Sequence, residues 1–313
     1  MEGTEIEMTD LKFKPVEAED MKVLAPYFGL RPNKTCDSVP LDSFIWRKYY
    51  HVRYAIHENK ALLWLMKEDG VMHSAMPLCK EEDLKKYFDM TVEYFNQVLH
   101  IPFKIYLADE EAVEFLHLKE SEDFAVTEQE DLKDYLYDGE AMRKLSGKKL
   151  HKKKNHLNAF LKEYEGRYEF RRLCCSDRDD VWRFLDRWRE RKGDEAEEHL
   201  DYEVEGIHEI LKQCLDLDIR MSGVYIDGKL EAFTIGSYNQ AENMAVIHIE
   251  KANPEIRGLY QFINQQFLVQ EFPDVTLVNR EDDLGQEGLR HAKMSYNPCG
   301  FARKYLVQQK NFK

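Results

Sequence analysis

The sequence predicts an α/β protein with mixed sheets, built as two lobes of similar design. Its 313 residues suffice for two hydrophobic cores, and 43% hydrophobic residues are typical of a globular chain. Alternating apolar runs that flank turn residues, as around Asp227-Gly228, indicate antiparallel strands. Both halves carry one succession: helices, a three-strand meander, then helix, strand, helix and strand. We therefore expect two domains, residues 1–140 and 141–313.

The first half is assigned from helical spacing and from alternation. Glu17–Phe28 carries apolar residues one helical turn apart and is followed by Gly29, which predicts a helix that stops there. The other expected elements are a helix at Pro40–Tyr50, strands at His51–Ile56, Ala61–Met66 and Val71–Met76, a helix at Lys80–Leu99, a strand at Phe103–Leu107, a helix at Glu110–Leu118 and a strand at Phe124–Val126.

The second half begins with a helical pattern between Gly147 and Gly166. Asn253 and Pro254 are expected to cap a helix that runs to Glu271. The other expected elements are a strand at Tyr168–Leu173, helices at Arg178–Arg191 and Val204–Leu215, strands at Ile219–Ile226, Leu230–Tyr238, Met244–Glu250 and Val275–Val278, a helix at Gln286–Ser295 and a strand at Phe301–Val307.

Composition excludes several classes of protein. A net charge of −14 argues against a chain whose whole surface binds nucleic acid or anionic lipid. No apolar run approaches the roughly 20 residues that cross a bilayer, and the first residues lack the features of a signal peptide. We expect a soluble cytoplasmic protein without integral membrane association. The six cysteines show no zinc-site spacing, so we expect reduced thiols and no metal.

One basic segment stands out against this acidic background. From Arg143 to Lys154 there are seven cations and no acid. On the helix expected there, most lysines point away from the apolar stripe, whereas Lys154 lies near its edge beside Asn155, with Asn158 one turn on. The hypothesis is that this helix faces the phosphates of a donor substrate. The alternative is a solvated face and a linker between the halves.

A second polar concentration follows the strand at Val275–Val278. Asn279 to Asp283 form a charged turn, and the next helix carries Arg290 and Lys293. Ligands of open α/β sheets bind at such strand ends, where the backbone donors of the following helix point into the crevice. The alternative is a solvated loop with surface ion pairs.

These two regions carry a family resemblance. Tyr137–Glu140, leading into Leu145–Phe160, looks like the signature of uncharacterised bacterial proteins related to the soluble C-terminal part of phosphatidylglycerol lysyltransferases. The second motif is Asn279–Gly285, continuing through Gly288–Pro298. The element order also resembles the acetyltransferase-like (GNAT) fold, whose sheet splays beside its fourth strand to admit an acyl donor. Motifs and element order together cover nearly the whole chain.

The resemblance implies two tandem acetyltransferase-like domains, with the site in the second. It also implies an acyltransferase that moves an aminoacyl group from aminoacyl-tRNA to an acceptor. The phosphates that face the segment from Arg143 to Lys154 would then be those of a tRNA acceptor end or of the pyrophosphate of coenzyme A. The acceptor, a small molecule or a lipid, is left open. The alternatives are an acetyl-CoA-dependent N-acetyltransferase and a binding protein for an anionic or amino-acid-like ligand.

Aminoacyl transfer needs a base, an oxyanion partner, and a carboxylate for the donated ammonium group. We assign catalysis to Asp282, Glu281 and Tyr296. Substrate binding is assigned to Lys154, Asn155, Asn158, Asn279, Arg280, Asp283, Arg290 and Lys293. The alternatives are that Arg290 pairs with Glu287 on the helix surface and that Tyr296 is a packed aromatic residue. His248 alternates with Val246 and is interpreted as a sheet histidine.

A cofactor loop has weaker support. Acetyltransferases of this fold hold pyrophosphate with R/Q-x-x-G-x-G/A between the fourth strand and its helix. Here only Arg257 and Gly258 resemble that loop, their spacing differs, and Pro254 lacks an N–H donor. We therefore expect no required cofactor, with acyl-CoA a less favoured donor than aminoacyl-tRNA.

Overall fold

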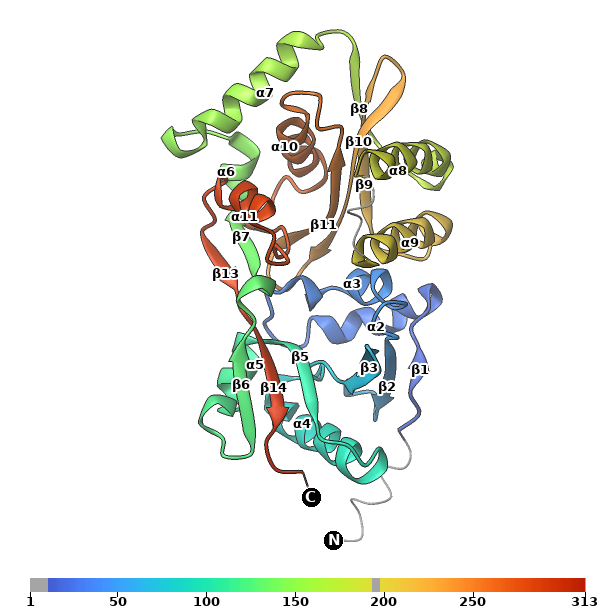
Figure 1. Ribbon diagram of the computed structural model, residues 1–313, viewed down its shortest axis with the longest axis vertical. Coiled ribbons are helices and arrows are strands. Elements are labelled where there is room, and N and C mark those ends of the chain that lie inside the picture. Colours follow the sequence, from blue (N-terminus) through green and yellow to red (C-terminus); the bar gives the residue numbers. More distant parts are fainter. Residues whose placement is uncertain (1–10, 193–197, 313) are drawn as a thin grey trace. The chain divides into compact units, whose positions relative to one another are not determined.

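Figure 1 shows the protein as a computed structural model that describes residues 11–192 and 198–312. The chain forms two compact units: Met1–Lys133 with Ala302–Lys313 is unit 1, and Asp134–Phe301 is unit 2. Compared with the expected division, residues 134–140 lie in unit 2, and a segment near the C-terminus lies in unit 1. Residues 1–10, which lack signal-peptide features, fall outside the described part.

Unit 1 contains a four-stranded and a three-stranded sheet, in the orders β1-β2-β3-β4 and β5-β14-β6. The turn residues Asn59, Asp69 and Gly70 have positive φ, as tight hairpin turns between twisted strands require. The strands are β1 Lys14–Pro15, β2 Arg53–His57, β3 Ala61–Glu68, β4 Val71–His73, β5 Lys104–Asp109, β6 Phe124–Glu128 and β14 Lys304–Gln309. The longer helices are α2 Met21–Phe28, α3 Pro40–Ile45, α4 Leu84–Glu93 and α5 Glu110–Phe115.

β14 is the middle strand of the three-stranded sheet. It pairs antiparallel with β5 from Lys304 to Gln308, and with β6 from Tyr305 to Gln309. Val307 is fully buried in a core that also contains Phe88 and Phe103. A strand distant in sequence therefore joins β5 to β6.

Unit 2 is built on a seven-stranded sheet in the order β13-β7-β12-β11-β10-β9-β8 (Figure 1). Asp227 and Gly228 form the positive-φ turn between β9 and β10, as the Asp-Gly pair predicted. The strands are β7 Asp134–Asp138, β8 Tyr168–Arg172, β9 Arg220–Ile226, β10 Lys229–Asn239, β11 Met244–Ala252, β12 Leu277–Asn279 and β13 Gly300–Ala302.

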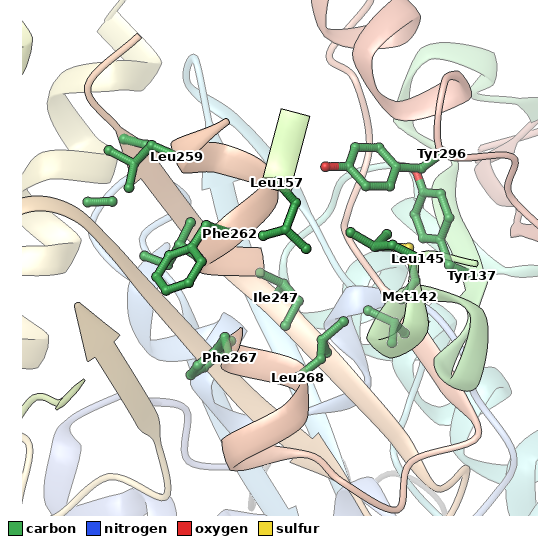
Figure 2. Close-up of a cluster of buried hydrophobic side chains, with 14 of the residues drawn as sticks. Tyr137, Met142, Leu145, Leu157, Ile247, Leu259, Phe262, Phe267, Leu268 and Tyr296 are labelled. Atoms are coloured by element: carbon green, nitrogen blue, oxygen red, sulfur yellow. The ribbon is translucent and has the colours of Figure 1, made fainter. Parts of the chain in front are cut away.

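Helices pack against this sheet. Phe184 of α8 contacts Phe233 of β10, with ring centroids 5.5 Å apart. A separate cluster joins α6, α7 and α10 to the sheet, including Met142, Leu157 and Phe262 (Figure 2). The helices are α6 Gly139–Lys144, α7 His151–Glu163, α8 Arg178–Lys192, α9 Glu198–Gln213, α10 Leu259–Glu271 and α11 Glu287–Met294.

The sheet of unit 2 splays between β11 and β12. These parallel strands pair only from Met244 to Val246 on β11, opposite Leu277 to Asn279 on β12. β11 continues to Ala252, and over its second half no described strand pairs with it on that side. The splay expected from the acetyltransferase-like element order is therefore present.

Several element predictions were wrong in their bounds. β7 and α6 were not expected as elements, and the single strand expected at Phe301–Val307 is two strands in different sheets. The helix expected to start at Asn253-Pro254 begins at Leu259, because Gly258 at its N-cap has a φ of 83° that ends a preceding turn. The helix expected at Lys80–Leu99 is divided into a 3₁₀ turn, α4 and a π turn at Tyr94–Val98.

The expectation of reduced thiols was also wrong for Cys175 and Cys214, whereas the other four cysteines are reduced. Cys175 and Cys214 form a disulfide, with Cα atoms 6.0 Å apart, that joins the turn before α8 to the end of α9. Sequence spacing could not reveal this pair, because 39 residues separate the two cysteines and packing of the helices brings them together. Within the described residues, none of the helices combines the length and apolar character needed to cross a membrane.

Candidate functional site

The turn after β12 is fixed by Asn279. Its side-chain oxygen accepts a hydrogen bond from the backbone N–H of Glu281 at 2.7 Å, and its Nδ2 donates to Asp134 Oδ2 at 3.0 Å. Asn279 and Asp134 are both fully buried. Glu281 has a φ of 58°, a conformation that needs such support in a residue with a side chain. The buried Asn279 side chain therefore holds the backbone of the turn in place.

Asp283 ties the turn to α11 and β7. Arg290 donates to both carboxylate oxygens at 2.9 Å, the backbone N–H of Gly285 donates at 2.9 Å, and the Tyr135 hydroxyl donates to Oδ2. These donors, Arg290 foremost, lower the pKa of Asp283 to about 2 despite its burial. Asp283 and Arg290 thus pair with each other and hold the helix against the turn.

Lys293 binds the backbone of the same turn. Its buried ammonium donates to the backbone oxygen of Arg280 at 2.5 Å and to that of Asp282. Burial lowers the pKa of Lys293, and the nearby carboxylates of Asp282 and Glu281 oppose this effect. Its hydrogen bonds to the turn backbone make Lys293 part of the frame of the site.

Arg280 extends from this frame toward the splay. Its Nη2 donates to Glu250 Oε1 at 2.9 Å, and Asn264 donates to the other oxygen of Glu250 at 2.7 Å. The guanidinium lies 4.8 Å from the Tyr296 ring centroid. Its Nη1 is buried and has no hydrogen-bond partner among the described residues. A buried guanidinium N–H without a partner is costly, and an anionic or carbonyl oxygen would satisfy it.

Tyr296 connects the splay to α7. Figure 2 shows its ring beside that of Tyr137, and the two ring centroids lie 6.4 Å apart in an edge-to-face arrangement. Burial raises the pKa of Tyr296 to about 12, and the charge of Arg280 opposes this shift. The Nζ atom of Lys153 on α7 lies 4.2 Å from the Tyr296 ring centroid. Burial and the charge of Arg280 lower the pKa of Lys153.

A second polar chain runs from the turn into the sheet. Glu281 Oε1 lies 2.9 Å from His248 Nδ1, and His248 Nε2 lies 2.7 Å from Ser237 Oγ. Ser237 and His248 are buried on β10 and β11, whereas the Glu281 side chain is 21% exposed. A proton taken up by Glu281 therefore has a hydrogen-bonded path to two interior groups.

The remaining predicted residues lie in the turn itself and on α7. Asp282 caps its own turn by accepting from the backbone N–H of Leu284 at 3.1 Å. Asn155 and Asn158 are exposed, and Lys154 is half-buried. The structure thus brings the α7 side chain Lys153 to Tyr296, where the sequence analysis had selected Lys154.

Arg257 and Gly258 contact α7. Arg257 Nε lies 3.5 Å from His156 Nδ1. A Cβ on Gly258 would lie 2.1 Å from the His156 oxygen, so this position needs glycine for helix packing. In the loop before it, the N–H groups of Glu255 and Ile256 are both bound by Asn253. The loop therefore offers few free donors for a pyrophosphate.

Two cavities of unit 2 lie elsewhere. One of about 520 Å³ is lined mainly by β8 and α10, including Phe170 and Phe262. The other, of about 730 Å³, is lined by Cys174 and by both disulfide cysteines. None of the predicted site residues lines either cavity, and the two share Arg172 and Glu271.

Sequence reasoning missed Glu250, Lys153 and the partners of His248. Glu250 and His248 alternate along β11 and so point to one face, a sign that could have been read from the strand. Lys153 lies three residues after Leu150 and four before Leu157, which places it on the apolar stripe of its helix. The contact between His248 and Glu281, by contrast, is set by a turn 33 residues away.

Comparisons with known proteins show the family of the chain. The family described as phosphatidylglycerol lysyltransferase, C-terminal, matches residues 37–308. The uncharacterized protein MYCGA3080 of Mycoplasmoides gallisepticum is 26% identical over 234 residues, which are 74% of this chain and 73% of that protein.

Solved structures show the same fold. A conserved protein of unknown function from Bacteroides thetaiotaomicron VPI-5482 has a TM-score of 0.87 and 26% identity, over 96% of this chain and 100% of that one. The structure of L-PGS from Bacillus licheniformis has a TM-score of 0.67 and 14% identity, over 96% and 95% of the two chains. The C-terminal domain of a putative lysylphosphatidylglycerol synthetase from Agrobacterium fabrum has a TM-score of 0.67 and 15% identity, over 94% and 93%. The expected mixed α/β class is confirmed, and these structures share the fold of the chain.

Proposed function

Because this chain belongs to the family of the phosphatidylglycerol lysyltransferase C-terminal domain, we propose that it is an acyltransferase that moves an aminoacyl group from aminoacyl-tRNA to a nucleophilic acceptor. The observation that carries this proposal is Arg280. It is a largely buried cation whose Nη1 lacks a hydrogen-bond partner within the described chain, and it lies at the splay between β11 and β12. Oxygens that gain negative charge during acyl transfer need such a donor.

The reaction replaces one bond to the carbonyl carbon by another. The acceptor's nucleophilic atom attacks the ester carbonyl of the donor and loses a proton to a base. The carbonyl oxygen gains negative charge in the tetrahedral intermediate. The ester bond to the tRNA ribose then breaks, and the ribose oxygen takes up a proton.

Arg280 would bind the oxygen that gains charge. Glu250 binds Nη2 of the guanidinium, and Asn264 in turn binds Glu250. Little rearrangement of Arg280 is therefore needed when the charge forms. Lys153 would add a second positive charge near the Tyr296 ring. Its partial burial strengthens its attraction for an anion relative to a surface lysine.

Glu281 is the proposed base. Its carboxylate is partly exposed and contacts His248, which in turn contacts Ser237, so the proton can be shared along this chain. Tyr296 is the proposed acid for the leaving ribose oxygen. Because its pKa is raised to about 12, its hydroxyl keeps its proton at neutral pH.

The basic segment would hold the phosphates of the tRNA acceptor end. Arg143 is already bound to the backbone oxygens of Phe272 and Val275, and Lys144 pairs with Glu140. The cations left exposed for phosphate are Lys148, Lys149 and Lys152, with Lys154 half-buried. Acyl-CoA is the less favoured donor, because the loop at residues 253–258 uses its own backbone donors.

The test is a transfer assay with tRNA charged separately with each radiolabelled amino acid. Acceptors would be phosphatidylglycerol vesicles and a panel of free amines, and acetyl-CoA would replace the donor in a parallel arm. The proposal expects label to move from one or a few charged tRNAs and no acetyl transfer. Acetyl transfer alone would show that the donor is wrong, and binding of charged tRNA without transfer would favour a binding protein.

A further inference from the structure

We infer that two copies of this chain associate through β8, extending the seven-stranded sheet of unit 2 across a two-fold axis at Phe170. β8 is the end strand of the sheet, and among the described residues no strand pairs with its outer edge. Exposed sheet edges carry unsatisfied N–H and C=O groups that another strand can pair with. This inference is independent of the proposed function.

The hydrogen-bond pattern shows which backbone groups face outward. Leu173 donates to the Met221 oxygen, and Asp227 donates to the Arg167 oxygen, so odd-numbered residues of this strand bond to β9. In an antiparallel pair the bonding residues alternate. The N–H and C=O groups of Tyr168, Phe170 and Arg172 therefore point to the open edge, two residues apart.

Antiparallel pairing centred on Phe170 uses all of these groups. Phe170 would face Phe170 of the second copy, and Tyr168 would face the second copy's Arg172. Each of these pairs exchanges two backbone hydrogen bonds in an antiparallel ladder. If one strand were shifted by one residue, the outward-facing backbone groups of one copy would lie opposite groups of the other copy that already bond to β9. Backbone geometry therefore favours this register.

Side-chain charge is complementary in the same register. Glu169 of one copy would lie opposite Arg171 of the other, and the two-fold axis makes this pair occur twice. On the other face, the Tyr168 ring would lie opposite the Arg172 guanidinium, a cation–π arrangement. Glu169 is exposed, and the Arg172 side chain, which pairs with Glu271 of its own chain, is 72% exposed. A second copy thus matches this edge in both hydrogen bonds and charge.

The adjacent cavity supports the same occupant. Tyr168, Phe170 and Arg172 line the cavity of about 520 Å³, with Phe262 behind them. The pairing would place the cavities of both copies on one side of the joined sheet. It would also cover aromatic surface that a single copy leaves half-buried.

The test measures the oligomeric state of the full chain by sedimentation and light scattering over a range of concentrations. The expected result is a reversible dimer of the 37.2 kDa chain. Glu169→Arg and Arg171→Glu should each raise the dimer dissociation constant about tenfold, because two attractive pairs become repulsive. Glu165→Arg makes the same charge change outside β8 and should leave the constant unchanged.

Mixing the two charge variants distinguishes pairing through β8 from pairing through any other surface. At positions 169 and 171 the Glu169→Arg chain carries only arginine, and the Arg171→Glu chain carries only glutamate. Every opposed pair in their heterodimer is then attractive, so an equal mixture should dimerise as the unchanged chain does. The double variant Glu169→Arg with Arg171→Glu should dimerise on its own.

Folding of the variants needs its own control, because Arg171 also pairs with Asp177. Circular dichroism checks that each variant is folded. A monomer at high micromolar concentration, or a mixture that fails to dimerise, would overturn the inference.

Discussion

Arg280 donates from Nη2 to Oε1 of Glu250 over 2.9 Å, and this ion pair joins the turn after β12 to the part of β11 that no described strand pairs with on its β12 side. The pair links the two sides of the splay. Because Asn264 holds the second oxygen of Glu250, the guanidinium keeps one orientation, with Nη1 left to a ligand.

Arg280→Lys should keep the positive charge but lose the directed N–H. We expect transfer to fall by about 100-fold or more with a folded protein, as is typical when one donor to an oxyanion is removed. Single-turnover rates with charged tRNA measure the effect. Arg167→Lys, at an exposed pair with Asp227, is the matched control and should retain activity. Equal rates for both variants would exclude the oxyanion role.

Lys153→Met should weaken donor binding more than Lys152→Met, because Lys153 lies at Tyr296 whereas Lys152 is exposed. The lowered pKa of Lys153 gives a second readout. As pH rises, Lys153 loses its charge at a lower pH than an ordinary lysine, so donor affinity should fall there. Lys153→Arg stays protonated and should remove this pH dependence. Fluorescence polarisation with a non-hydrolysable aminoacyl minihelix measures the affinity.

Glu281→Gln should lower the rate of transfer while leaving donor affinity within about twofold, because the amide cannot accept the acceptor's proton. His248→Gln should have a smaller effect of the same kind, since His248 acts through Glu281. Transfer rates measured across pH at saturating donor distinguish the effect of Glu281→Gln from that of His248→Gln. If Glu281→Gln instead weakened donor binding with an unchanged rate, the carboxylate would be an ammonium anchor.

Asp283→Asn should lower the free energy of unfolding by about 2 kcal/mol at neutral pH, since the carboxylate is bound by Arg290 and Tyr135. The pKa of Asp283 falls from an ordinary 3.8 to about 2 in the folded protein. Its stabilisation is therefore fully present above about pH 4 and is lost as pH falls toward 2. Urea denaturation at several pH values should show this loss only in the unchanged chain. Asp227→Asn, at an exposed pair, should change stability little.

Gly258→Ala should destabilise the protein more than Gly228→Ala. Both glycines have positive φ, 83° and 80°, so alanine carries a similar backbone cost of about 1 kcal/mol at each. Only at Gly258 would the added Cβ strike another atom, the His156 oxygen. Thermal melts of the two variants isolate the packing of α7 against α10. Equal shifts in Tm would show that this packing relaxes freely.

The element order was predictable because alternation and helical spacing are local signals. Asp227-Gly228 marked its hairpin, and the length of β11 beyond its partner followed from the acetyltransferase-like order. The start of α10 and the break between β13 and β14 were not predictable, since they depend on a left-handed glycine and on pairing with distant strands.

The sequence selected the turn after β12 but could not show the directions in which its side chains point. Charge and position selected Arg280 and Glu281, and they could not show that Asn279, Asp283 and Lys293 are turned inward to hold the backbone. The hydrogen-bond partners of a side chain distinguish a residue that supports a turn from one that can meet a ligand. That property arises from the packed structure.

The position of β14 has a consequence for biosynthesis. The ribosome releases β5 and β6 early, but the strand that joins them emerges only after every residue of unit 2 has been made. Unit 1 is therefore translated first, but its three-stranded sheet is completed last. Until then its two outer strands lack their shared neighbour, and the contiguous unit 2 is free to fold ahead of it.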